Sequence, residues 1–188
     1  MGYYYLLASM PLLAPGKAPP VTAEGFLAAA ETALPPALLR LVREIMDHGE
    51  VSGHPFLDAV RNIEAQIVNT QAERRAEQRK VDAGPGLPYG HVNLYVVHGV
   101  NGAFLAENPL QRQRELTALR FAVLDDLLVG RPYGEDAVLA YALKLRLALR
   151  LSGIDPEEGR EAFRDMAERA VENAVRTTNA GDHSRSES

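Results

Sequence analysis

Residues 135–151 read EDAVLAYALKLRLALRL, and this stretch decides the fold class. Its second half nearly alternates between apolar and charged residues, which is a strand pattern. The residues themselves are mainly Leu, Ala, Lys and Arg, which are strong helix formers, and no β-branched residue follows Val138. We therefore predict a helix. Leu143 and Leu147 lie on one side of this helix and Leu145 nearly opposite, so neighbours must cover both sides and the helix is central to the C-terminal half.

Clear helix-start signals stand on both sides of this central stretch. Asn108 can cap a helix that has Pro109 at its first position and runs to about residue 127. Asp155, followed by Pro156 and two glutamates, can cap a last helix that ends near Arg176. Apolar residues at helical spacing give the last helix a packing face, formed by Ala162, Phe163, Met166, Ala170 and Val171.

Three further helices are predicted in the N-terminal half. Thr22 can cap a helix over residues 23–34, and Pro35 and Pro36 suit the start of a second helix that stops at Gly49. A third helix begins near Pro55 and carries an amphipathic stripe of Phe56, Val60, Ile63 and Ile67. After Val68 the stripe ends, and residues 69–80 are almost entirely polar. We expect this last part to project into solvent or to contact a partner.

Two segments interrupt the helical pattern. Residues 82–90 contain three glycines and two prolines, which indicates a linker. Residues 91–100 (HVNLYVVHGV) have a strand-like composition without an evident partner strand, so an irregular or helical segment is expected. The sum is an all-α compact bundle of about six helices over residues 1–176. It forms either one domain or two lobes, 1–81 and 91–176, joined by the linker, with a polar disordered tail at 177–188.

Composition narrows the function classes. A net charge of −5 argues against general nucleic-acid binding, which needs a surplus of cations. The absence of cysteine excludes disulfides and thiolate chemistry. The longest apolar stretch is short and is interrupted by charges, so we expect no direct membrane insertion. No positive residue precedes the apolar N-terminal run, which makes it a poor signal peptide. A soluble cytoplasmic protein is expected.

No pattern in the chain is typical of a reaction centre. The sequence Gly84-Pro85-Gly86 lacks the Lys and Ser or Thr of a nucleotide-binding loop, and the common hydrolase signatures are missing. Histidine spacings match no zinc pattern. Asp125 and Asp126, as helix neighbours, point about 100° apart and cannot converge on one substrate atom. We therefore predict no catalytic, cofactor-binding or metal-binding residue.

Three groups of residues are candidates for contact with another protein. Tyr3, Tyr4 and Tyr5 either anchor the N-terminus on the helical body or form an interface, where tyrosine is enriched. The second group consists of the cations Arg74, Arg75, Arg79 and Lys80 in the third helix, and the third group of Lys144, Arg146 and Arg150 in the central helix. These side chains either stay solvated and pair with carboxylates or contact a partner.

Several short motifs occur in an order that resembles a known family. They are Tyr3 to Pro11, Asn108-Pro109-Leu110, Leu124-Asp125, Tyr133, the run from Val138 to Leu145, and Asp155 to Phe163 (DPEEGREAF). In this order they resemble a family of small bacterial proteins related to the C subunit, also called d, of V-type ATPases. The family's full-length subunits are all-helical and funnel-shaped. They sit on the membrane rotor ring, accept the central stalk and transmit torque without chemistry of their own.

The resemblance implies a function and a location. The chain would be a non-catalytic subunit or accessory factor of a bacterial V-type (A-type) ATPase, coupling the central stalk to the rotor ring. Its partners would be those subunits, it would need no cofactor, and they would hold it at the inner face of the cell membrane. The chief alternative is a helical adaptor or assembly factor with no role in rotation. A small-molecule enzyme comes third, because no residue spacing predicts a polar acid–base pocket.

Overall fold

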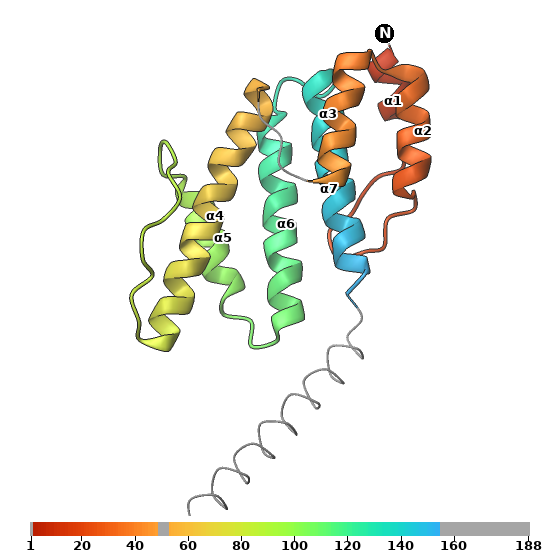
Figure 1. Cartoon of the computed structure of the whole chain (residues 1–188). Coiled ribbons are helices and arrows are strands. Elements are labelled where there is room, and N and C mark those ends of the chain that lie inside the picture. Colours follow the sequence, from red (N-terminus) through yellow and green to blue (C-terminus); the bar gives the residue numbers. More distant parts are fainter. Residues whose placement is uncertain (1, 49–52, 155–188) are drawn as a thin grey trace, which may run out of the picture. The chain divides into compact units, whose positions relative to one another are not determined.

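The computed structural model describes residues 2–48 and 53–154, and the elements in these ranges are all helical (Figure 1). In chain order they are α1 (Gly2–Ser9), α2 (Ala23–Ala33), α3 (Pro36–Asp47), α4 (Pro55–Arg79), α5 (Leu94–Ala103), α6 (Pro109–Leu127) and α7 (Glu135–Ser152). The prediction of an all-α fold is confirmed. The predicted stop at Gly49 and the predicted last helix and tail, from Asp155 onward, lie outside the described residues.

Five of the predicted helices are present with nearly the predicted bounds, and the two predicted cap residues among them, Thr22 and Asn108, form their caps. The Thr22 side chain accepts a hydrogen bond from the backbone N–H of Gly25 at 3.1 Å and starts α2. The Asn108 side chain accepts one from Leu110 at 2.8 Å and starts α6. At the other end of α4, Lys80 adopts a left-handed conformation with φ 56°, which ends the helix.

Two helices, α1 and α5, are additional to the predicted six. The segment that forms α5 was expected to be irregular or helical, and it is helical from Leu94 onward. Asn93 caps it, since its side chain accepts hydrogen bonds from the N–H groups of Tyr95 and Val96 at 3.0 and 3.4 Å. Helix α1 is short and carries one fully buried residue, Leu6.

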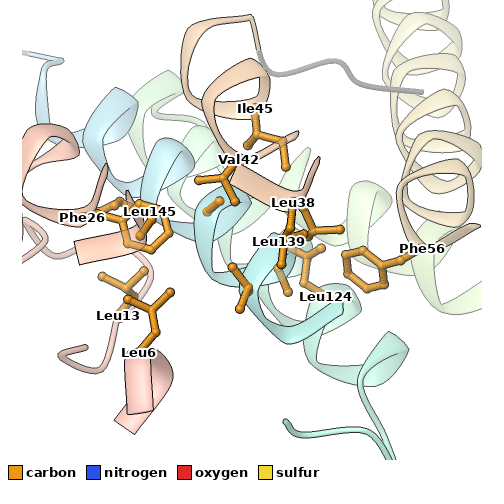
Figure 2. Packing of buried hydrophobic residues seen from close by; sticks show 14 of the residues in the cluster. Leu6, Leu13, Phe26, Leu38, Val42, Ile45, Phe56, Leu124, Leu139 and Leu145 are labelled. Atoms are coloured by element: carbon orange, nitrogen blue, oxygen red, sulfur yellow. The ribbon is translucent and has the colours of Figure 1, made fainter. Parts of the chain in front are cut away.

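The larger hydrophobic cluster is built around α7 (Figure 2). Helix α7 packs against α1, α3 and α6, and α2 packs against α1 and α3. Leu139 and Leu145 are fully buried, while Leu143 and Leu147 are half-buried against the same cluster. Both sides of α7 are therefore covered, as the sequence predicts. Figure 2 labels these buried members of the cluster: Leu6, Leu13, Phe26, Leu38, Val42, Ile45, Phe56, Leu124, Leu139 and Leu145.

A second, smaller cluster joins α4, α5 and α6. Its buried members are Ile67, Val96, Val100, Ala103, Leu116, Leu119 and Val123. Helix α6 contributes to both clusters, because Leu124 faces the larger one and Leu119 the smaller one. Figure 1 shows α6 between the pair α4 and α5 and the group that contains α7. The Arg120 guanidinium also binds both carboxylate oxygens of Glu64 at 2.8 and 2.9 Å, which ties α6 to α4.

Candidate protein-interaction surface

Tyr3 ties α1 to the start of α7. Its hydroxyl donates a hydrogen bond to Glu135 Oε1 at 2.9 Å, and the His54 imidazole lies 3.8 Å from the other oxygen of the same carboxylate. The hydrogen bond to Glu135, followed by burial and the charge of that carboxylate, raises the pKa of Tyr3. Because its hydroxyl is engaged by Glu135, Tyr3 contributes to the attachment of α1.

Tyr4 and Tyr5 instead face solvent, with 54% and 70% of their surface exposed. The ring of Tyr4 lies 5.2 Å from that of Tyr133 and 5.9 Å from that of Tyr5, measured between centroids. Tyr133, in the loop between α6 and α7, is itself 64% exposed. We call Tyr4, Tyr5 and Tyr133 the tyrosine cluster. Grouped exposed tyrosines are typical of surfaces that bind other proteins, since each ring offers apolar area and a polar tip.

Residues 130–136, in the loop that carries Tyr133, line a shallow depression of about 370 Å³ that is open to solvent. Gly130 has a φ of +79°, a left-handed turn that glycine adopts without strain. Arg131 forms an ion pair with Asp136 at 2.7 Å across this loop. The only acid groups of the lining are Glu135 and Asp136, and both are already engaged, Glu135 by Tyr3 and Asp136 by Arg131. The depression therefore suits contact with a partner's side chain better than acid–base chemistry.

The three candidate cations of α7 have different surroundings. Lys144 Nζ lies 2.5 Å from Asp125 Oδ1 and 5.4 Å from the centre of the Phe121 ring, so it ties α7 to α6. Arg146 is half-buried and Arg150 is exposed. Among the described residues, neither arginine has a carboxylate within 4.0 Å.

The candidate cations at the end of α4 also divide into one that links two helices and others that are exposed. Arg74 donates to the Asn101 side chain at 2.6 Å and to Glu77 at 2.7 Å, which links α4 to α5. Arg75 donates to the Gln71 side chain at 3.2 Å and is otherwise exposed, as are Arg79 and Lys80. The exposed candidate cations of this group, Arg75, Arg79 and Lys80, therefore lie at the C-terminal end of α4.

The expectation that residues 69–80 project into solvent or contact a partner needs a correction. Asn69, Thr70, Gln71 and Ala76 are buried, because α5 and the segment before it cover one face of this half of α4. The segment between α4 and α5, residues 80–93, runs back along α4 (Figure 1). We call it the connector.

Three amide side chains of α4 hold the connector in place. Asn69 donates to the Leu87 carbonyl and accepts from the Leu87 N–H, both at 2.8 Å. Gln66 donates to the His91 carbonyl at 3.1 Å and accepts from the Asn93 N–H at 2.7 Å. Asn62 accepts from the Gly90 N–H at 2.6 Å. These amides take the place of a neighbouring strand, since they satisfy backbone groups that an isolated extended segment would leave to water.

Sequence reasoning missed the amide contacts and the membership of Tyr133 in the tyrosine cluster. Asn62, Gln66 and Asn69 follow one another at i, i+4 and i+7, so they share one helix face, and that spacing is a signal in the sequence. Nothing in the sequence places Tyr133 beside Tyr4, because the two are brought together only by the packing of α1 on α7.

The described residues contain no group of three or more histidines, aspartates or glutamates arranged to hold a metal ion. In the same residues no helix is long and apolar enough to cross a membrane. Comparison of the chain with protein-family models, curated proteins and solved structures gave no match.

Proposed function

We propose that the chain is a non-catalytic subunit or accessory factor of a bacterial V-type (A-type) ATPase, which couples the central stalk to the rotor ring. The proposal rests on the family resemblance of its motifs, and one observation supports it. Motifs that lie far apart in the sequence contact each other in the fold. The ring of Tyr4, in the first motif, contacts that of Tyr133 in a tilted arrangement, and Tyr141 of the central run donates a hydrogen bond to the Pro11 carbonyl at 3.0 Å.

The other motif residues within the described part of the chain belong to the same assembly of helices; the motif from Asp155 to Phe163 lies outside it. Leu6, Leu124, Val138 and Leu145 share the larger cluster, and Asp125 pairs with Lys144. Asn108 caps the helix that carries Leu124 and Asp125. The described residues that carry the resemblance thus form one supporting framework, and this framework holds the tyrosine cluster at its surface. Their shared structural role explains why these motifs occur together in one sequence, although none of them contains an expected catalytic residue.

A protein that transmits torque needs helices that do not slide on one another. Here α7 is packed on several sides, α6 takes part in both clusters, and ion pairs cross from helix to helix at Arg120–Glu64 and Lys144–Asp125. A close-packed interior of this kind transmits strain rather than absorbing it. In the proposed function the tyrosine cluster contacts a neighbouring subunit, and such partners hold the chain at the cytoplasmic face of the membrane.

The test is a pull-down of the tagged full-length chain from gently solubilised native membranes, with partners identified by mass spectrometry. The proposal predicts recovery of rotor-ring and central-stalk subunits in a fixed ratio. Tyr4→Ala combined with Tyr133→Ala should lower that recovery, whereas Leu105→Ala, at an exposed position outside the cluster, should leave it unchanged. Recovery of no ATPase subunit, from membranes that contain the intact enzyme, would contradict the proposal and favour the adaptor alternative.

A further inference from the structure

The connector presents an unusual number of apolar side chains to solvent. Its backbone is fixed to α4 by the amides of Asn62, Gln66 and Asn69, yet its large apolar side chains are not buried by this arrangement. The exposed ones on the connector and the first turn of α5 are Val81, Leu87, Tyr89, Val92, Leu94 and Tyr95. We call these six residues the connector patch.

The polar side chains at the connector face inward and the apolar ones face solvent, which is the reverse of the usual arrangement in a surface loop. A loop that only links two helices turns polar side chains outward, and its backbone is hydrated by water. Here polar side chains point inward and hold the backbone: Gln66 is 2% exposed and both ends of its amide bond the connector. Gly86 permits this closeness, since a Cβ there would lie 2.9 Å from Asn69 Cγ. The bonds fix the position of the connector patch without burying it.

A surface fixed in this way is prepared for binding. A partner that docks on a pre-ordered segment does not bear the entropy cost of ordering it. Leu94 and Tyr95 follow the Asn93 cap, so they sit on the first turn of a regular helix rather than on a loose loop. Grouped apolar and aromatic side chains on a rigid support are the usual anchors of a protein interface.

The charges around the connector patch select its occupant. Between Lys80 and His98 the chain has a single carboxylate, Asp82. At the α4 end of the connector Arg75, Arg79 and Lys80 are exposed. Glu77 is paired with Arg74, and Glu73 is a further exposed carboxylate, so cations remain in excess. A second copy of the same patch would bring like charges together and is not complementary. An anionic lipid surface would face the same cations, but the net charge of −5 on the whole chain opposes binding to such a surface. The complementary occupant is an apolar surface with an acidic border.

We propose that the connector patch binds the apolar face of an amphipathic helix on another protein, with acidic side chains of that helix facing Arg75, Arg79 and Lys80. Helices of this type bind apolar surfaces through residues at i, i+3, i+4 and i+7. The inference does not depend on the ATPase assignment, because it follows from the connector and its amides alone. It gives the chain a second interaction surface besides the tyrosine cluster.

The test places a photo-crosslinking amino acid, benzoylphenylalanine, at position 94 of the full-length chain in its native cells. Irradiation should give one discrete adduct heavier than the 20.5 kDa chain, and the crosslinked peptide should be an amphipathic helix with an acidic border. The absence of an adduct, an adduct of two copies of the chain, or labelling of lipid alone would each overturn the proposal.

Matched variants separate binding from folding in this experiment. Tyr95→Asp should lower the yield of the adduct about tenfold, because it puts a charge into an apolar contact. Leu105→Asp, at an exposed apolar position outside the connector patch, should leave the yield unchanged. Circular dichroism and the melting temperature establish that both variants are folded. If folded Tyr95→Asp gives the full yield, the connector patch is not the binding surface.

A third variant tests the role of the amides. Asn69→Ala removes both bonds to Leu87 and should lower the crosslinking yield several-fold while leaving all six apolar side chains in place. A yield equal to that of the wild type would show that fixing the connector does not prepare it for binding, which overturns that part of the proposal.

Discussion

The region around α7 and the connector along α4 are fixed by different forces. Around α7 the buried contacts are mainly apolar, and residues such as Leu139 and Leu145 lose all contact with water. Along α4 the contacts that hold the connector are hydrogen bonds from side-chain amides to backbone groups, while its apolar side chains stay exposed. The first region makes the framework rigid, and the second holds a surface ready for contact.

This difference predicts how each region responds to mutation. Loss of a buried apolar side chain removes transfer free energy and leaves a cavity, so it weakens the whole fold. Loss of an amide at the edge of the fold frees a segment that water can then hydrate, so the effect is mainly local. The variants below probe these two responses, in order of their expected effect on stability.

Leu145→Ala should have the largest effect. The side chain is fully buried at the centre of the larger cluster, and its truncation should lower the free energy of unfolding by about 2–5 kcal/mol. Urea denaturation followed by circular dichroism measures the change, with Leu105→Ala as the exposed control. A loss of less than about 1 kcal/mol would mean that α7 is not the centre of the fold.

Gln66→Ala should have a smaller effect on global stability and a larger one on the connector. It removes both hydrogen bonds of this side chain to the connector, each worth about 0.5–1.5 kcal/mol net, so the free energy of unfolding should fall by about 1–3 kcal/mol. Proteolytic cleavage within residues 82–91 should become about fivefold to a hundredfold faster, because each 1.4 kcal/mol increases the open population tenfold.

The matched control for this variant is Leu145→Ala studied under the same protease. It should accelerate cleavage throughout the chain in proportion to its global destabilisation, without singling out the connector. If Gln66→Ala leaves the cleavage rate of the connector unchanged, the amides do not hold it.

Tyr141→Phe should have the smallest effect at neutral pH, about 1 kcal/mol, because it removes one hydrogen bond to the Pro11 carbonyl. Its clearer signature is at high pH. Burial raises the pKa of Tyr141 to about 12, against about 10 in an unfolded chain. Stability that depends on the protonated hydroxyl is complete below pH 10 and is lost as the pH rises through 12.

The variant should therefore lose less stability than the wild type between pH 10 and pH 12, measured by urea denaturation at each pH. Tyr95→Phe, at an exposed tyrosine, serves as the control and should leave the alkaline loss as it is in the wild type. An equal alkaline loss in the wild type and in Tyr141→Phe would mean that Tyr141 is not responsible for it.

The comparison of the two regions also explains what the sequence could predict. The region around α7 follows from residue patterns, because apolar periodicity and caps such as Thr22 and Asn108 are local signals. The connector does not, since a Gly- and Pro-rich segment gives no sign of what fixes it. The sequence does not decide whether residues 94–103 are helical, because their Val and Tyr favour strands, although Asn93 is a recognisable cap.

The candidate interface, too, is predicted from the sequence only in part. The sequence singles out Tyr4 and Tyr5 by composition, but their neighbour Tyr133 joins them only through the packing of α1 on α7. Tyr3 and Lys144 were candidates of equal standing in the sequence, and the fold engages both, with Glu135 and Asp125 respectively. Which of several similar residues stays free is a property of tertiary contacts, and no spacing rule contains it.

The proposed coupling role is tested most directly by the ratio of ion translocation to ATP hydrolysis in membrane vesicles from cells that lack this chain. With a coupling role, we expect hydrolysis to continue while translocation per ATP falls, and addition of the purified chain to restore the ratio. An unchanged ratio in the absence of the chain, whether or not the amount of enzyme falls, would contradict a coupling role.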